Sequence, residues 1–276
     1  MRVGLCQLPV AADLNCNHAA MRKMVMQAAD AGCEIVCLPE MWTCPYENAA
    51  FTAFAEPIGG KTWQCLRQTA IDAGVFLIGG SFPELEDDRL YNTCCVFDAA
   101  GEQIAKHRKV HLFDIDVPGQ RFMESDTFTP GDSFTVFDTP FGRIGVAICF
   151  DIRFVEPFRL MALMGAKALF VPGAFNQTTG PAHWELSFRA RAVDNQCFTF
   201  GCAPACDWNA SYHSYGHSIV CDPWGNVIRQ LDDSPGLLVQ DVDLSEADRL
   251  RNQLPILNNR RTDLYQIHFG NQEWSI

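Results

Sequence analysis

The chain has 276 residues, of which 48% are hydrophobic, and its formal net charge is −12 at pH 7. A chain of this size can bury an apolar core without disulfides or a metal, so we expect one domain over residues 1–276. Nucleic acids and anionic membranes favour basic surfaces, so the acidic balance argues against both as partners. No apolar run approaches the roughly 18 to 20 residues of a membrane span, and the apolar run at the start of the sequence is too short for a signal sequence. We therefore expect a cytoplasmic protein, with mitochondria as a second possible location.

The thirteen cysteines are scattered through the chain, and many lie inside apolar runs, as Cys37, Cys95, Cys197 and Cys221 do. An odd number of cysteines in such positions indicates small buried hydrophobes in a reducing compartment, and not a disulfide framework.

Short apolar, β-branched runs alternate with stretches of helical period, which is typical of an α/β domain. They predict strands at 3–8, 35–38, 75–81, 92–97, 144–149, 168–171, 198–202, 218–221 and 237–242.

Two amphipathic helices are predicted between these strands. Residues 21, 24, 25 and 28 are apolar and share one face, so a helix over 15–31 is expected, with Gly32 able to end it. A second helix is predicted after Gly180–Pro181, where proline suits a first helical turn. Its apolar face is formed by Leu186, Ala190 and Val193, which repeat the helical spacing.

"CDPWGNV" at 221–227 predicts a hairpin turn between two strands. From about residue 245 the sequence predicts a short helix and then an irregular tail, which we expect to pack on a neighbouring subunit.

Three reactive residues follow predicted strands. Glu40 comes after Pro39 at the end of a buried strand, Lys109 follows an extended run, and Cys149 ends "RIGVAIC" just before a helical pattern that stops at Gly165. Open α/β sheets present functional groups at the carboxyl ends of their strands. Taken singly, each residue has an ordinary explanation: a core cysteine, a solvated turn acid and a solvated basic face.

Together these groups define a chemistry. A free thiol titrates near 8.5, so at neutral pH it needs a base or a cation beside it to become a nucleophile. Glu40 and Lys109 supply one of each, and backbone N–H groups near Phe150, at the start of a helical turn, are free to donate to an oxyanion. This set predicts thiolate attack on a carbonyl or nitrile carbon.

A different feature imitates a zinc site. Cys202 and Cys206 lie four residues apart, as do His213 and His217. The gap between the pairs is six residues, well short of the usual 12 or so, and we expect no metal.

Four ordered motifs resemble the Glu-Lys-Glu-Cys signature of the nitrilase superfamily of carbon–nitrogen hydrolases. They are "LPEMW" around Glu40, "HRKVHLFDID" around Lys109, "FMES" around Glu124 and "ICFDIRF" around Cys149. The resemblance runs from Val3 to about Tyr265. "KVHLFDIDVPG", "TPGDSF", "PGAFNQTTGPAHWEL" and "RAVDNQ" are most similar to the omega-amidase branch, which removes the terminal amide of 2-oxoglutaramate and 2-oxosuccinamate.

The resemblance implies a four-layer α-β-β-α sandwich, a homodimer, a 2-oxo acid amide as substrate and no cofactor. Carried over by position, it makes Cys149 the nucleophile and Glu40 the general base. Lys109 becomes the oxyanion stabiliser, and Glu124 a second acid that positions the lysine and the leaving group. Only the resemblance points to Glu124.

An anionic substrate needs a cation and hydroxyl donors at its 2-oxo acid end. Arg153 is our candidate for the carboxylate, because a guanidinium can bond to it bidentately. Its alternative is an ion pair with Glu156 or Asp151. The candidate hydroxyl donors are Tyr46, Thr178 and Thr179. The candidate walls of the pocket are Phe175 and Trp184. Because both are aromatic residues near a helix, their alternative is a place in the hydrophobic core.

Other activities use the same Glu-Lys-Cys core. A nitrilase, an N-carbamoyl-amine hydrolase and an aliphatic amidase are the alternatives within hydrolases, and a binding or regulatory protein that keeps the fold without turnover is an alternative of another class.

Overall fold

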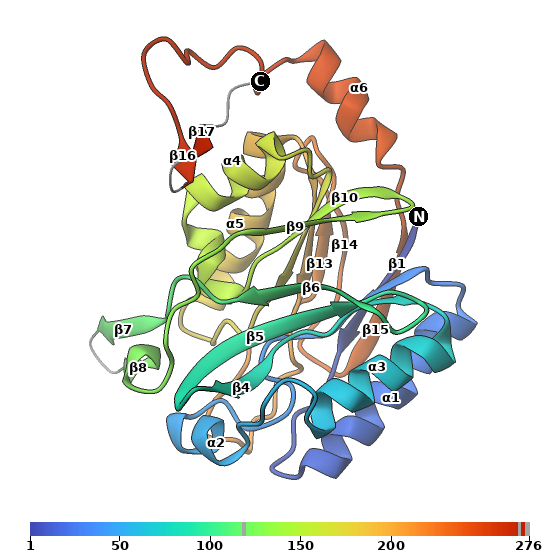
Figure 1. The fold of residues 1–276 in the computed structure, drawn as a ribbon, viewed down its shortest axis with the longest axis vertical. Coiled ribbons are helices and arrows are strands. Elements are labelled where there is room, and N and C mark those ends of the chain that lie inside the picture. The colour runs from blue at the N-terminus through green and yellow to red at the C-terminus, as the bar shows by residue number, and fades with distance from the viewer. Residues whose placement is uncertain (118–119, 270–271, 274–276) are drawn as a thin grey trace.

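Two β-sheets lie face to face with helices on their outer sides in the computed structural model of the protein (Figure 1). The predicted four-layer α-β-β-α sandwich is confirmed. The structure describes residues 1–117, 120–269 and 272–273. Pro118 and Gly119, which end the motif "KVHLFDIDVPG", lie outside the described residues.

The first sheet has seven strands, and β1, β2 and β3 are parallel neighbours in it. Its order is β15 (Gly236–Asp241), β1 (Arg2–Gln7), β2 (Ile35–Cys37), β3 (Phe76–Ile78), β5 (Arg89–Phe97) and β4 (Phe82–Glu86), with β6 (Gln103–Arg108) also paired to β5. Because β5 is antiparallel to both β3 and β6, strand β6 runs in the same direction as β2 and β3.

The second sheet has six strands with a parallel centre formed by β10, β11 and β12. Its order is β14 (Val227–Gln230), β13 (Ile219–Cys221), β12 (Phe198–Cys202), β11 (Ala168–Pro172), β10 (Gly142–Val146) and β9 (Thr135–Thr139). Each predicted strand has a counterpart in these sheets. The strand predicted over 144–149 ends early, at Val146, and Cys149 instead opens a 3₁₀ turn.

The helices are divided between the two outer faces (Figure 1). Helices α1 (Leu14–Asp30) and α3 (Lys61–Ala73) pack on the first sheet, and α4 (Val155–Leu163) and α5 (Gly180–Asn195) pack on the second. The remaining elements are α2 (Asn48–Ala53), α6 (Ser245–Gln253), the hairpin β7 (Asp114–Val117) and β8 (Gln120–Met123), and β16 (His268–Phe269) with β17 (Gln272–Glu273).

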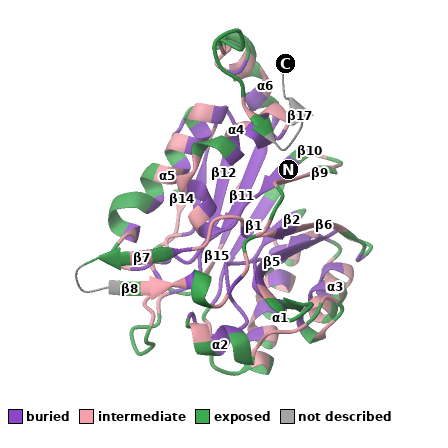
Figure 2. Cartoon of the chain, turned by 60° about the vertical axis from the view of Figure 1, so that its left-hand side comes forward, coloured by how far each residue is buried: buried purple, intermediate pink, exposed green. Residues whose placement is uncertain are grey.

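Alternating residues of the first sheet serve two different cores. Ile35 and Cys37 face the second sheet, whereas Val36 and Leu38 face α1 and α3. This follows from the two-residue period of a strand, and it explains why the strand reads as an unbroken apolar run. Figure 2 shows the sheets as a continuous buried band between partly exposed helices.

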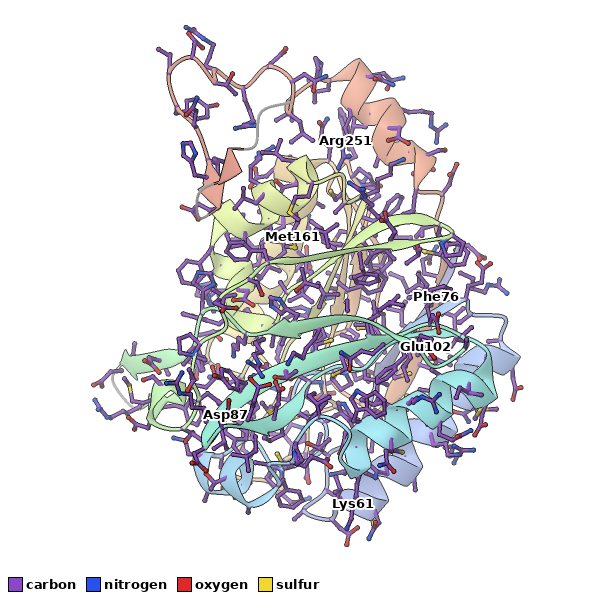
Figure 3. The ribbon with its side chains drawn as sticks, viewed as in Figure 1. Lys61, Phe76, Asp87, Glu102, Met161 and Arg251 are labelled. Atoms are coloured by element: carbon purple, nitrogen blue, oxygen red, sulfur yellow. The ribbon has the colours of Figure 1, made fainter. Side chains whose placement is uncertain are left out.

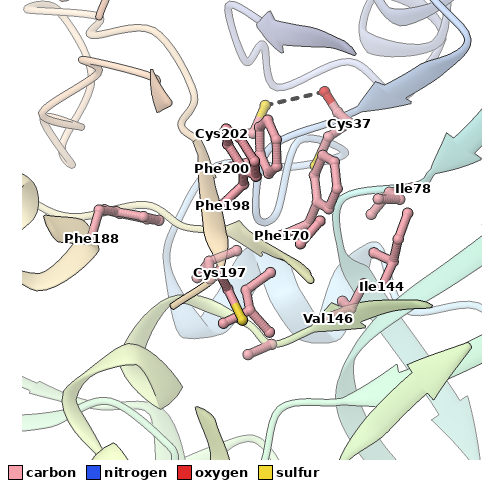
Figure 4. Packing of buried hydrophobic residues seen from close by; sticks show 14 of the residues in the cluster. Cys37, Ile78, Ile144, Val146, Phe170, Phe188, Cys197, Phe198, Phe200 and Cys202 are labelled. Carbon is pink, nitrogen blue, oxygen red and sulfur yellow. Dashed lines mark hydrogen bonds between the residues drawn. The ribbon is translucent and has the colours of Figure 1, made fainter. Parts of the chain in front are cut away.

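The two sheets make contact through aromatic rings and cysteines (Figure 4). Phe170 of β11 and Phe200 of β12 are neighbours within the second sheet, and their rings stack with centroids 4.3 Å apart. The Cys202 thiol crosses between the sheets and donates a hydrogen bond of 3.2 Å to the carbonyl of Cys37 in the first sheet. Side chains fill the spaces between the layers, for example Met161 of α4 beneath the second sheet (Figure 3). The predicted role of cysteines as small buried hydrophobes is confirmed at Cys37, Cys95, Cys197 and Cys221, which are all fully buried.

Both predicted helices form, but the second buries a different face from the one expected. In α5 the side chains of Leu186 and Val193 are 64% and 43% exposed, whereas Trp184, Phe188 and Ala192 are buried. The sequence of α5 carries two apolar stripes. The stripe with the larger aromatic side chains removes more area from water, and it is the one that faces the sheet.

The predicted hairpin at 221–227 joins β13 to β14, with Gly225 at a positive φ of 89°. The short helix predicted after residue 245 is α6. Within the described residues, no helix combines the length and apolar character needed to cross a membrane.

Gly80 fixes the turn next to Glu40, and we expect Gly80→Ala to destabilise the protein strongly. A Cβ atom there would lie 2.1 Å from the carbonyl oxygen of Pro39, and the residue has φ +63°. Gly74→Ala is a matched control, because Gly74 has φ +64° but no atom within 4 Å of its added Cβ. Urea unfolding should show a loss of about 1 kcal/mol for the control and about 2 kcal/mol or more for Gly80→Ala. Equal losses would contradict the proposed clash.

Candidate active site

The Lys109 ammonium lies between two buried carboxylates. Its Nζ atom donates to Glu40 Oε1 at 2.9 Å and to Glu124 Oε2 at 2.7 Å, and the three side chains have no exposed surface. Three of the sequence-predicted residues therefore meet, although 84 positions separate the first from the last. Such a cluster is stable in the interior only because every charge has an opposite charge within hydrogen-bond distance.

Strand direction explains why these residues converge. Glu40 follows β2 and Lys109 follows β6, and because the two strands run the same way, both residues reach the same edge of the first sheet. Glu124 opens the 3₁₀ turn η1 (Glu124–Asp126) after β8. Cys149 opens η2 (Cys149–Arg153) after β10, so it comes from the opposite sheet.

Other groups fill the remaining acceptor positions of the two carboxylates. Asn92 Nδ2 donates to Glu40 Oε1 at 2.9 Å and to Glu124 Oε1 at 3.1 Å. The Ala174 N–H donates to Glu40 Oε2 at 2.8 Å, and the Phe113 N–H donates to Glu124 Oε2 at 2.5 Å. Sequence reasoning missed Asn92. Its only signal is the pair of polar residues, Asn92 and Thr93, inside the otherwise apolar strand "YNTCCVF".

The charges of the cluster stabilise one another. Burial acts to lower the pKa of Lys109, but the carboxylates of Glu124 and Glu40 outweigh it and the net pKa is raised, so the lysine stays cationic. Burial raises the pKa of Glu124, the Lys109 ammonium only partly offsets this, and the Glu40 carboxylate adds to it, so the net pKa is raised. The lysine is thus a permanent positive charge in a dry site.

Cys149 is 5% exposed and has an unusual backbone, with φ +44°. Burial raises the pKa of its thiol well above the ordinary value, and the Glu40 carboxylate raises it further, while Lys109 acts to lower it. The sulfur is therefore a neutral thiol at rest that lies within the electrostatic influence of a carboxylate and an ammonium. A positive φ at a residue other than glycine costs energy, and such strained residues cluster at functional sites.

Two cavities meet at this site. A small one of about 10 Å³ includes Cys149, and its walls are Phe113, Phe150, Arg153, Ala174, Phe175, Asn176, Thr179 and Tyr212. A larger one of about 310 Å³ includes Glu40, Met41, Tyr46 and the loop around Ala210. Ala174 and Tyr212 line both cavities, so the Tyr212 ring, stacked on Tyr46 at 4.5 Å, stands between them. Tyr212 was also missed, because its loop is remote in sequence from the four catalytic motifs.

Arg153 points into the small cavity beside the sulfur. Its guanidinium lies over the Phe175 ring, 4.9 Å from the centroid, and its Nη1 is 3.0 Å from His183 Nδ1. Among the described residues it makes no ion pair with either alternative partner, Glu156 or Asp151. Burial lowers the pKa of this guanidinium.

The remaining predicted residues divide into two groups. Phe175 and Thr179 line the small cavity, and Tyr46 lines the larger one, with its hydroxyl 3.4 Å from Glu40 Oε1. Thr178 and Trp184 line neither cavity. Trp184 is fully buried behind Phe175, and its Nε1 donates to the carbonyl of His217, which is the core position given as its alternative.

The cysteine and histidine pairs that imitate a zinc site serve other contacts. The Cys202 thiol bonds to a carbonyl of the opposite sheet, and His217 Nδ1 lies 2.6 Å from the Tyr215 carbonyl oxygen. In the part of the chain that the structure describes, no three histidine, cysteine or acidic side chains are grouped as metal ligands.

Comparison with known proteins agrees with this geometry. The model of the carbon-nitrogen hydrolase family matches residues 2–252. Omega-amidase NIT2-A of Xenopus laevis is 49% identical over 94% of this chain and 93% of its own length. Omega-amidase NIT2 of Mus musculus is 47% identical over 96% and 97%. The crystal structure of Saccharomyces cerevisiae Nit3, a member of branch 10 of the nitrilase superfamily, superposes with a TM-score of 0.88 at 37% identity, covering 95% and 96% of the two chains.

The chain belongs to the carbon–nitrogen hydrolase family of the nitrilase superfamily, and the resemblance found in the sequence is confirmed. Within that family, the relatives that match it at 47–49% identity over nearly their whole length include omega-amidases.

We expect Glu40→Gln to lower the pKa of the Cys149 thiol. The carboxylate of Glu40 disfavours a neighbouring thiolate, so its removal leaves the cation of Lys109 less balanced and the thiolate more stable. The pH dependence of iodoacetamide labelling at Cys149, followed by peptide mass spectrometry, measures this shift. Glu47→Gln is the control, because Glu47 lines the larger cavity and should leave the midpoint unchanged. A midpoint that rises in Glu40→Gln would contradict the arrangement.

Proposed function

We propose that this hydrolase is an omega-amidase, which converts the terminal amide of a 2-oxo acid such as 2-oxoglutaramate or 2-oxosuccinamate to the carboxylate and ammonia. The observation that carries the proposal is the Glu40–Lys109–Glu124 cluster beside the sulfur of Cys149, with a cationic side chain, Arg153, in the same cavity. The identity of 47–49% to omega-amidases over nearly the full length supports the choice of substrate class.

In the first half of the reaction, Glu40 accepts the thiol proton as the sulfur attacks the amide carbon. This transfer leaves the total charge of the buried site unchanged, because a carboxylate is neutralised as a thiolate forms. The oxyanion receives a charge-assisted hydrogen bond from Lys109 and one from the Phe150 N–H, which has no acceptor within the described part of the chain. Collapse of the intermediate breaks the carbon–nitrogen bond, the nitrogen takes the proton from Glu40, and ammonia leaves a thioester.

In the second half, Glu40 removes a proton from water as the water oxygen attacks the thioester carbon. The carbon–sulfur bond then breaks, the sulfur recovers its proton from Glu40, and the carboxylic acid departs. Glu124 holds Lys109 in place through both steps. Hydrogen bonds from Asn92 and the Ala174 N–H hold the Glu40 carboxylate in one orientation, so that one group serves both proton transfers.

Substrate orientation follows from the difference between the two cavities. Glu47 and Asp207 line the larger one, which disfavours an anionic group there, whereas Arg153 lies in the smaller one with the sulfur. We therefore place the 2-oxo acid end of the substrate against Arg153 and Thr179, with Phe175 as a wall. The small cavity has room for at most about one water molecule, so binding requires the Tyr212 ring to move toward the larger cavity.

A panel of 2-oxo acid ω-amides, nitriles and N-carbamoyl amines, assayed for ammonia, tests the reaction. We expect release from the ω-amides, and complete loss in Cys149→Ala, because no other group in the site can form the covalent intermediate. Cys149→Ser, which keeps the side-chain size, controls for a packing defect.

A different profile would change the assignment. Release from nitriles or carbamoyl amines alone would favour a nitrilase or an N-carbamoyl-amine hydrolase, and release from simple aliphatic amides alone would favour an aliphatic amidase. Ammonia release at the wild-type rate by a folded Cys149→Ala protein would refute the thiol mechanism. No ammonia release from any compound of the panel would favour a binding protein.

Arg153→Lys should separate carboxylate recognition from chemistry. Lysine keeps the charge but loses the bidentate fork, so the KM for a 2-oxo acid ω-amide should rise about tenfold, while a neutral amide of the same length is unaffected. Arg159→Lys is the matched control, since Arg159 is a half-buried arginine of α4 outside both cavities. Equal KM increases for the charged and neutral amides would point to a general packing role for Arg153.

We also propose a homodimer that uses the outer face of α5. Leu186 and Val193 form an exposed apolar stripe there. Gly225 lies close to Val193, so the adjacent Trp224, which is 63% exposed, lies next to this stripe. Leu264 and Tyr265 of the tail are also more than half exposed, which supports packing of the tail on a second copy. A cytoplasmic location remains a proposal, supported by the thirteen free cysteines, most of them buried.

Sedimentation velocity tests the dimer. Wild-type protein should sediment as twice the chain mass of 30.8 kDa, and Leu186→Glu should shift it toward the monomer, because a charge would be buried without a partner. Leu85→Glu, at an exposed leucine of β4 in the first sheet, is the control. A wild-type monomer, or a dimer unaffected by Leu186→Glu, would refute the proposed face.

A further inference from the structure

A second buried carboxylate, Asp151, lies two residues after Cys149 and is 2% exposed. Both of its oxygens are fully engaged. Oδ1 accepts hydrogen bonds from the N–H of His111 at 2.9 Å and from His111 Nδ1 at 2.8 Å. Oδ2 accepts from the N–H of Ile148 at 2.9 Å and lies 3.3 Å from His107 Nε2. Four donors converge on one side chain that the reaction described above does not use.

These four donors come from the two segments that carry the reacting groups. His107 and His111 flank Lys109 at two residues on either side, and Ile148 immediately precedes Cys149. The Lys109 segment belongs to the first sheet and the Cys149 turn to the second. Asp151 therefore joins the ammonium and the sulfur through backbone and side-chain bonds, across the boundary between the sheets.

The surroundings of the histidines stiffen this connection. His107 Nδ1 lies 3.1 Å from the Thr135 hydroxyl, and the His111 ring stacks on Phe154 at 3.7 Å with an interplanar angle of 13°. Burial acts to raise the pKa of Asp151, but the bonds from His107, His111 and Ile148 prevail and hold it well below the ordinary value. The carboxylate is therefore ionised at neutral pH.

We propose that Asp151 is a positioning residue that fixes the sulfur of Cys149 at its working distance from Lys109. The inference rests on the proposed roles of Cys149 and Lys109. Neither Asp151 nor the two histidines line the cavity over the sulfur, so they act through the residues they hold and do not touch substrate. The strained φ of Cys149 needs such a restraint, since a free turn would relax toward an ordinary conformation.

Asp151→Asn removes the charge and places an N–H₂ donor against donors that already converge there. We expect kcat for ammonia release to fall about 100-fold with KM changed less than about twofold, because a displacement of the order of 1 Å at a reacting atom has that effect. Glu84→Gln is the matched control. Glu84 is another fully buried carboxylate with several partners, Lys106, Arg108 and Thr93, but it has no contact with the Cys149 turn. It should lose a similar amount of stability and keep most of its kcat.

A second pair of variants covers the case in which Asp151→Asn does not fold. His107→Gln retains an N–H donor toward Asp151, whereas His107→Leu has none. The kcat of the glutamine variant should therefore be at least about tenfold above that of the leucine variant, because only the leucine variant loses this charge-assisted hydrogen bond. A folded Asp151→Asn protein with kcat within threefold of wild type, or equal values for the two His107 variants, would overturn the proposal.

Labelling of Cys149 by iodoacetamide gives a readout that needs no substrate. Asp151→Asn should label about tenfold more slowly than wild type, and Glu84→Gln at the wild-type rate, because only the first loosens the thiol from Lys109. If wild-type protein releases no ammonia from any ω-amide while this labelling difference holds, the proposed function fails and the positioning role stands. If ammonia release is normal and labelling is equal in all three proteins, the positioning role fails alone.

Discussion

The ion cluster of Lys109 with Glu40 and Glu124 is the interaction on which the rest of the site depends. Burying three charged groups without exposed surface carries a large desolvation cost. The attraction between the opposite charges offsets this cost only when all three groups are present and correctly placed. That requirement explains the supporting residues. Asn92 bridges the two carboxylates, and the N–H groups of Phe113 and Ala174 complete their coordination. The surrounding strands are therefore fixed by charge balance as well as by apolar packing.

Local patterns predicted the fold well because its two sheets have regular strands and its helices regular periods. Strand ends followed by Glu40, Lys109 and Cys149 were visible in the sequence, since the carboxyl edge of parallel strands is where such groups collect. Glu124 was found only through the family resemblance, because it starts a short turn with no pattern of its own. Asn92 and Tyr212 were missed, because their contacts join segments remote in sequence.

Two errors at the level of elements have physical causes. The strand predicted over 144–149 has no ladder partners after Val146, although Ile148 is still extended, and the positive φ of Cys149 then turns the chain into η2. The apolar stripe of α5 that was noticed in the sequence is exposed, because a second stripe of larger aromatic side chains packs on the sheet. Periodicity gives the type of an element reliably, but a helix with two apolar faces needs tertiary information to decide which one is inside.

The reacting groups are divided between the two halves of the sandwich. Glu40 and Lys109 extend from strands of one sheet, whereas Cys149 extends from the other, and a hydrogen bond from the Cys202 thiol to the Cys37 carbonyl joins the two layers. Neither sheet alone contains both a proton acceptor and a nucleophile. A small displacement of one sheet relative to the other, too small to unfold any helix, would already separate these groups and abolish turnover. Loss of activity is therefore a more sensitive measure of how the two sheets pack than any spectroscopic measure of secondary structure.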